Sequence, residues 1–306
     1  MKKILITGAP RSGTTFLGEM LNLSNKVLYV WEPFNSNFRE GLKYYYPYWG
    51  KSSSNRKKNY LLNVIMETIA LKNLKGSIRN SRNDTYLESL IKNAGINRTR
   101  IKYFITKLKA KVFSHDFLLI KDPIAIFLSE LLIQEFDFEV IICVRNPGSI
   151  IKSRLNLCWD FNFDWWLTQD DLKQEILSPH LKKISLSYDD KIAKAAIHWN
   201  IIYEYAHSLK KKYPNKVKIS LQEDLIENPI EKIGSIYNSL GLEYKQNHIK
   251  KIKKYTNGKN EIIQKENVSK IKKRNLKTIN DFEKAFSKDQ IRIINEITNK
   301  TASYYY

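Results

Sequence analysis

Cysteine is scarce in this chain of 306 residues, which has only Cys143 and Cys158. Two cysteines cannot form the disulfide framework of a small secreted domain, and Cys143 lies in an apolar run of strand type, so a cysteine metal site is not expected. No cluster of histidines and carboxylates has the spacing of metal ligands, and we expect no metal. No stretch approaches the roughly 18 apolar residues of a membrane span, and the apolar run before Gly8 is too short for a signal peptide. These absences favour a cytoplasmic protein.

Acidic residues are also few. The chain has 31 Asp and Glu against 52 Lys and Arg, which gives a formal net charge of +21. Such a charge invites a nucleic-acid-binding function. The lysines are scattered, however, and no zinc-finger or RNP signature occurs, so we expect no nucleic acid as partner. A positive cleft would attract a multiply charged anionic ligand, and an acidic acceptor or a membrane surface stays open as a partner.

The first motif follows an apolar run of strand type at the start of the chain. It reads Gly8-Ala9-Pro10-Arg11-Ser12-Gly13-Thr14-Thr15, and a segment with helical apolar spacing follows from Phe16. A strand, a glycine-bearing loop and a helix N-terminus together form a cradle for phosphate. The glycines have the spacing of a nucleotide-triphosphate loop, but Thr14 replaces its lysine, and the cation is Arg11 instead. The missing lysine argues against phosphoryl transfer from ATP or GTP.

The second motif follows another strand of buried type at residues 140–144. It begins with Arg145-Asn146-Pro147, and a helix then carries Ser153, eight residues beyond Arg145. Each of the two motifs therefore follows a strand, where parallel sheets place their ligands.

In this order, the two motifs resemble those of sulfotransferases that use 3′-phosphoadenosine-5′-phosphosulfate (PAPS), and the carbohydrate and prokaryotic branch in particular. The resemblance implies that Arg11 and the loop residues Ser12, Gly13, Thr14 and Thr15 bind the 5′-phosphosulfate. It implies that Arg145 and Ser153 hold the 3′-phosphate. The expected fold is a P-loop-type α/β domain of three layers, with a mostly parallel central sheet and helices on both faces. The expected reaction transfers the sulfuryl group of PAPS to an alcohol.

The acceptor side is predicted from residues after the next strand. Residues 27–31 read as a strand that ends at Glu32-Pro33. This pair resembles one that the same branch of the family has at this distance from the loop. The resemblance implies that the glutamate lies beside the acceptor hydroxyl. A carboxylate there can take the proton that the attacking alcohol loses, so Glu32 is our candidate general base. Aromatic residues are dense over 34–49 and 159–166, and in the second stretch they are interleaved with Asp160 and Asp164. This composition suits a saccharide or glycoconjugate acceptor, although core packing explains each single ring as well.

The remaining chain predicts one domain over residues 1–306, with a helical insertion at about 50–115 and a basic segment at about 243–306. We interpret His198, in the middle of a long helix, as structural. The resemblance implies that an aromatic residue of a helix after the second motif lies against the adenine, and Trp199 is the candidate. The resemblance also implies that a basic residue in the loop before the last helix covers the cofactor, with candidates Lys272, Lys273 and Arg274. The oligomeric state is not predictable from these patterns.

Two other functions remain open at this point. A P-loop kinase acting on a small molecule would need a carboxylate for magnesium, which Asp122 after a strand could supply, but it would lack the phosphate-binding lysine. A basic nucleic-acid-binding protein would leave the spacing between Arg145 and Ser153 unexplained.

Overall fold

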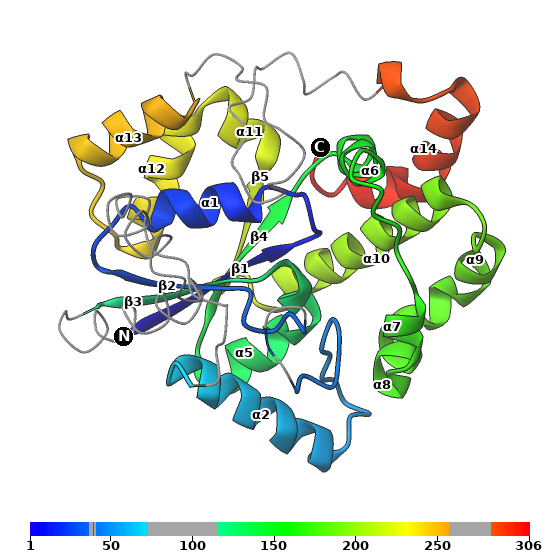
Figure 1. Ribbon diagram of the computed structural model, residues 1–306, viewed down its shortest axis with the longest axis horizontal. Coiled ribbons are helices and arrows are strands. Elements are labelled where there is room, and N and C mark those ends of the chain that lie inside the picture. Colours follow the sequence, from blue (N-terminus) through cyan, green and yellow to red (C-terminus); the bar gives the residue numbers. More distant parts are fainter. Residues whose placement is uncertain (37–38, 40, 73–114, 257–282) are drawn as a thin grey trace, which may run out of the picture.

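A parallel β-sheet forms the centre of the molecule (Figure 1). The computed structural model describes residues 1–36, 39, 41–72, 115–256 and 283–306. The strands are β1 (Lys2–Gly8), β2 (Val27–Trp31), β3 (Phe117–Lys121), β4 (Glu139–Val144) and β5 (Val217–Leu221), in the spatial order β2-β3-β1-β4-β5. All four pairings are parallel, so the five strands end at one edge of the sheet.

The strands are buried on both faces, as their continuous apolar sequences predict. Along β1, Ile4 and Ile6 join one hydrophobic cluster while Leu5 joins another, because successive side chains of a strand point to opposite faces. Helices α1 (Thr14–Leu21), α12 (Pro229–Leu240) and α13 (Gln246–Thr256) cover the first face. Helices α2 (Asn55–Ile69), α5 (Ser129–Phe136) and α10 (Lys191–Lys212) cover the second. The predicted α/β fold of three layers is confirmed.

Shorter elements connect these layers. They are η1 (Pro123–Leu128), α6 (Pro147–Leu155), α7 (Asp164–Leu167), α8 (Asp170–Leu172), the π-helical turn η2 (Lys173–Leu177), η3 (Ser178–His180), α9 (Leu181–Leu186), α11 (Gln222–Glu227) and η5 (Glu283–Ala285). The last helix is α14 (Lys288–Ala302), which begins with a capping box at Ser287. It packs on α10, where Thr301 donates a hydrogen bond of 2.6 Å to Asn200, and on α6 through Ile294 and Ile151.

The single domain, the insertion and the basic segment stay predictions. Helix α2 lies in the predicted insertion, whose residues 73–114 are outside the described part of the chain. The candidates Lys272, Lys273 and Arg274 also lie outside it. Helix α13 lies in the basic segment, where no helix was predicted before the last one. Across the described residues, no helix is both long and apolar enough to span a membrane.

Candidate active site

The phosphate-binding loop predicted from the sequence connects β1 to α1. Gly8 and Gly13 have φ angles of 139° and 97°, and Arg11 between them has a φ of 78°. An added Cβ on Gly8 would lie 2.4 Å from the carbonyl oxygen of Cys143 on β4, so only glycine allows the loop to pass this close. The loop therefore has the tight backbone that an anion cradle needs.

The polar groups of this loop fit an anionic ligand. Ser12 is fully buried, and its Oγ makes no hydrogen bond to the described residues. Gly13 is the N-cap of α1, where no side chain of the described chain caps the helix and no acidic residue occupies its first turn. The N–H groups and the dipole of a helix N-terminus favour an anion. Thr14 and Thr15, which carry hydroxyl groups, are the first two residues of this helix.

Arg11, Arg145 and Ser153 lie close together beyond the carboxyl ends of β1 and β4. Arg11 Nε donates a hydrogen bond of 3.0 Å to Ser153 Oγ, and Arg145 Nη1 donates one of 3.1 Å to the carbonyl oxygen of Arg11. Burial lowers the pKa of the Arg11 guanidinium. Its Cζ lies 5.9 Å from the ring centre of Trp159, which is 41% exposed. Arg11 and Arg145, which are 134 residues apart in the sequence, thus belong to one basic site.

Glu32 follows β2 at the same edge of the sheet, and it forms an ion pair with Lys121 at the end of β3. Its other carboxylate oxygen accepts a hydrogen bond of 2.9 Å from Asn35 Nδ2. Lys121 is fully buried, and its Nζ lies 4.8 Å from the ring centre of Trp31. We did not predict this pair, because it depends on β2 and β3 being neighbours in the sheet, which the sequence does not show.

Asp122, next to Lys121, is buried and caps the turn that follows. Its carboxylate accepts hydrogen bonds from the backbone N–H groups of Phe34 (2.7 Å) and Ile124 (3.1 Å). Burial and the neighbouring Glu32 raise the pKa of Asp122 to about 8. Both oxygens are occupied by backbone donors, so this residue holds two segments of the site together.

His198 lies in the core, which agrees with its interpretation as structural. The residue is fully buried, its Nδ1 lies 3.1 Å from Arg154 Nη1, and its ring stacks on Trp166 at 5.1 Å. Trp199 is fully buried too, so the prediction that it lies against the adenine is wrong. Its indole N–H instead donates a hydrogen bond of 2.9 Å to the carbonyl oxygen of Arg145, and so fixes the backbone of the second motif.

Most rings of the two aromatic clusters also belong to the core. Tyr46, Phe161 and Trp166 pack edge to face and are almost completely buried. Trp165 is the main exception besides Trp159, because it is 43% exposed, and its ring lies 4.5 Å from that of Tyr45. Core packing thus explains most of the aromatic density, and the exposed tryptophans remain for a ligand.

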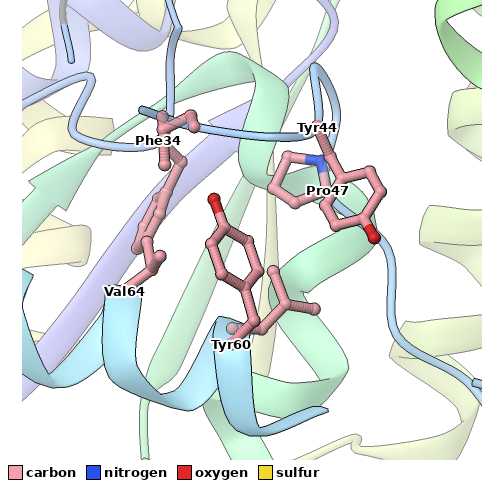
Figure 2. A pocket seen from close by; sticks show the side chains of 7 residues that line it. Phe34, Tyr44, Pro47, Tyr60 and Val64 are labelled. Carbon is pink, nitrogen blue, oxygen red and sulfur yellow. The ribbon is translucent and has the colours of Figure 1, made fainter. Parts of the chain in front are cut away.

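A small cavity lies between α2 and the segment after β2, away from the phosphate-binding loop (Figure 2). Phe34, Tyr44, Pro47, Tyr60 and Val64 are among the side chains that line it, and its volume is about 10 Å³. This is room for about one water molecule, so the cavity is too small for a sugar.

The family follows from the comparison with known proteins. A family model described as "Sulfotransferase family" matches residues 3–246, which include both motifs and Glu32. The chain belongs to the sulfotransferase family. The prediction of a PAPS-dependent sulfotransferase is confirmed at the level of the family and of the enzyme class. Of the three functions that the sequence left open, the family match therefore supports sulfuryl transfer.

Solved structures of sulfotransferases are similar to this chain. The sulfotransferase domain from the curacin biosynthetic pathway superposes with a TM-score of 0.50 at 14% identity, over 97% of each chain. The sulfotransferase domain of the olefin synthase from Synechococcus PCC 7002 gives 0.48 at 14% identity, over 96% of this chain and 93% of that one. A sulfotransferase from Mycobacterium avium gives 0.48 at 12% identity, over 99% and 76%. No curated protein matches the sequence significantly.

Proposed function

We propose that this sulfotransferase transfers the sulfuryl group of PAPS to a hydroxyl of a saccharide or glycoconjugate. The observation that supports the co-substrate best is the meeting of Arg11, Arg145 and Ser153 at the loop after β1. Two guanidinium groups, a hydroxyl and a helix N-terminus suit a nucleotide with phosphates on two sides of one ribose. The bound nucleotide would supply the activated sulfuryl group.

The loop would bind the 5′ side of the nucleotide. The backbone N–H groups of Gly13, Thr14 and Thr15 at the start of α1 would donate hydrogen bonds to the ligand, and so would the buried Ser12 Oγ. Arg11 would stabilise negative charge that develops on the transferring group and on the leaving phosphate. Its partial burial strengthens such an interaction, because it excludes water from the guanidinium.

Arg145 and Ser153 would hold the 3′-phosphate. Arg145 follows β4 directly, and Trp199 fixes its carbonyl oxygen, so its backbone is held in place. Ser153 lies on α6, whose N-cap Asn146 accepts a hydrogen bond from the Ser149 N–H at 3.2 Å. A rigid arginine and a serine on a short capped helix can select a phosphate at one position of the ribose.

Glu32 would take the proton of the acceptor hydroxyl. Its carboxylate is 13% exposed, and Lys121 and Asn35 hold it in one orientation at the edge of the sheet where the loop lies. A base that is fixed in this way needs no rearrangement when the acceptor arrives. The exposed Trp159, beside Arg11, and Trp165, beside Tyr45, offer aromatic faces to the C–H face of a sugar ring.

The nucleotide assignment can be tested by calorimetry with 3′-phosphoadenosine-5′-phosphate (PAP) and AMP. The wild-type protein should bind PAP more tightly than AMP. Arg145→Ala should weaken PAP binding about 10-fold to 100-fold, since a hydrogen bond to a charged group contributes roughly 1.5–3 kcal/mol, and should weaken AMP binding much less, because there the bond to the carbonyl oxygen of Arg11 is lost but no bond to a 3′-phosphate. Lys216→Ala, a matched loss of a surface cation paired with Asp137, should change neither affinity. Equal affinities of the wild type for PAP and AMP would contradict the assignment.

The acceptor class can be tested with PAPS labelled in its sulfuryl group. A panel of glycans and simple alcohols of similar size should give labelled product from the glycans. Trp165→Ala should raise KM for the glycan, because the ring supplies binding surface, and should leave the affinity for PAP unchanged. Preferential labelling of the simple alcohols would overturn the saccharide proposal and leave the nucleotide assignment standing.

A further inference from the structure

Three tyrosines at the end of the sequence, Tyr304–Tyr306, pack against the nucleotide-binding end of the molecule. Tyr305 Oη donates a hydrogen bond of 2.7 Å to the carbonyl oxygen of Tyr203 on α10. The ring of Tyr304 stacks on His207 of the same helix, with 3.9 Å between the ring centres and 15° between the planes. The last residues therefore follow α10 and reach the neighbourhood of α6 (Figure 1).

Tyr306 contacts an acidic residue at the edge of the site. Its Oη donates a hydrogen bond of 3.1 Å to Glu223 Oε2. Glu223 lies in the first turn of α11, directly after β5, and its other oxygen accepts a hydrogen bond of 3.0 Å from the backbone N–H of Asn146. Asn146 follows Arg145 and is the N-cap of α6. One carboxylate thus connects the phenol of Tyr306 to the backbone that carries Arg145.

We propose that Tyr306 is a positioning residue for nucleotide recognition, which acts through Glu223 on the segment Arg145–Asn146. This inference rests on the proposed binding of the 3′-phosphate by Arg145. The phenol holds one carboxylate oxygen, so the other stays directed at the Asn146 N–H and fixes the start of α6. Glu223 is an acceptor only, and a second donor is what keeps a carboxylate in one rotamer.

The geometry favours this function over simple anchoring of the chain end. Tyr305 and Tyr304 already attach the segment to α10 through a hydrogen bond and a ring stack. Tyr306 is 53% exposed, so it buries little apolar surface for stability. Its specific contact is the bond to Glu223, and that bond leads to Arg145 and not to the core.

Tyr306→Phe removes the hydroxyl and keeps the ring. The dissociation constant of PAP should rise about threefold to tenfold, the usual effect of one hydrogen bond at a partly exposed site, while that of AMP should not change. Tyr304→Phe is the matched control, since it removes a hydroxyl from the neighbouring ring and should change neither constant. Calorimetry gives the constants, and the midpoint of thermal unfolding should be the same in all three proteins.

A double-mutant cycle tests the connection through Glu223. Glu223→Ala should weaken PAP binding by itself, and Tyr306→Phe should then add no further loss, because the two residues act in series. If the wild type prefers PAP over AMP and Tyr306→Phe keeps the same preference, the proposed positioning function of Tyr306 is wrong, while the proposed binding of the 3′-phosphate is unaffected. The positioning function of Tyr306 would also be wrong if Tyr306→Phe weakened the binding of PAP and AMP equally, or if the losses in the cycle were additive. If the wild type shows no preference for PAP, both proposals fail.

Discussion

Arg11 and Glu32 share a backbone conformation that side chains rarely adopt. Their φ angles are 78° and 47°, which places both in the left-handed region, and only four other non-glycine residues of the described chain have a positive φ. Such a conformation costs roughly 1–3 kcal/mol and persists where the surroundings impose it, often at functional sites. For Glu32 the surroundings are clear, since its N–H donates a hydrogen bond of 2.7 Å to the carbonyl oxygen of Lys121 and its carboxylate pairs with the Lys121 ammonium. Strain at two residues that the sequence singles out for chemistry supports their assignment.

Glu32→Gln tests the general base at the scale of one residue. Glutamine keeps the size of the side chain and the bond to Asn35, but it cannot accept the proton, so kcat should fall roughly 10²-fold to 10⁴-fold. The affinity for PAP should stay the same, because Glu32 lies on the acceptor side. Turnover is measured with labelled PAPS at saturating acceptor, and PAP affinity by calorimetry.

Glu130→Gln is the matched control for this substitution. Glu130 lies in the first turn of α5 and pairs with Lys212 at the end of α10, and within the described part of the chain it contacts no residue of the candidate site, so the change should leave turnover normal. Near-normal turnover of Glu32→Gln, together with loss of activity in His198→Ala, would move the base to the histidine. The complete burial of His198 makes us expect the opposite.

At the scale of elements, strands were the easiest to predict from the sequence. The predicted strand at 27–31 matches β2, and the other predicted strands differ from the observed ones by a few residues at most. Continuous apolar runs between turns are a strong signal, because strands of a parallel sheet are buried on both faces. The loop after β1 and the turn Arg145-Asn146-Pro147 were equally visible, since their glycines, prolines and charges interrupt those runs.

Contacts between distant elements could not be predicted. The pairing of Lys121 with Glu32 depends on the order of the strands, and the contact of Gln222 with the loop depends on where β5 ends. Helix α13 was missed because only two of its residues, His248 and Ile252, are buried, and its many lysines hide the apolar stripe. The segment Asp164–Leu186 contains α7, α8, η2, η3 and α9, each too short for a helical period to show.

Gly13→Ala tests the element that joins β1 to α1. An added Cβ would lie 1.5 Å from Gln222 Oε1, at a φ of 97°, so Gln222 must move and the loop must shift. Gly241→Ala is the matched control, because its φ is 77° but no atom lies within 4 Å of the added Cβ. The control should lose only about 1–2 kcal/mol of unfolding free energy, from the backbone conformation alone. Gly13→Ala should lose roughly 1–3 kcal/mol more, and also its affinity for PAP.

Urea unfolding and PAP titration of both variants decide this point. Adding Gln222→Ala to Gly13→Ala should restore part of the lost stability, because the clashing side chain is gone. Equal losses in the two glycine variants would show that Gln222 does not press on the loop.

At the scale of the whole molecule, cations gather where the strands end. Arg11, Lys121 and Arg145 all lie in or just beyond the carboxyl ends of β1, β3 and β4. A net charge of +21 adds a positive field around them. Such a field raises the local concentration of a multiply charged anion. The basic composition is therefore consistent with a nucleotide ligand, and it needs no nucleic acid.

The pH dependence of global stability reports on His198. Burial and the nearby Arg154 lower the pKa of His198 well below its ordinary value of 6.5. In the range between the lowered pKa and about 6.5, the unfolded chain binds a proton that the native protein does not. The unfolding free energy contributed by His198 is therefore fully present above about pH 6.5 and falls as the pH decreases below it, by at most about 1.4 kcal/mol per pH unit.

His198→Gln should remove this part of the slope between about pH 5 and about pH 6.5. Urea unfolding at several pH values measures the slope, which separates the proton linkage from the constant cost of replacing a buried ring. His207→Gln is the control, because His207 lies near the surface of α10 and its pKa is lowered without complete burial, so its contribution should be much smaller. If the slope of His198→Gln equals that of the wild type, the native protein protonates His198 easily. The ring would then be accessible to water, and its assignment to the core would be wrong.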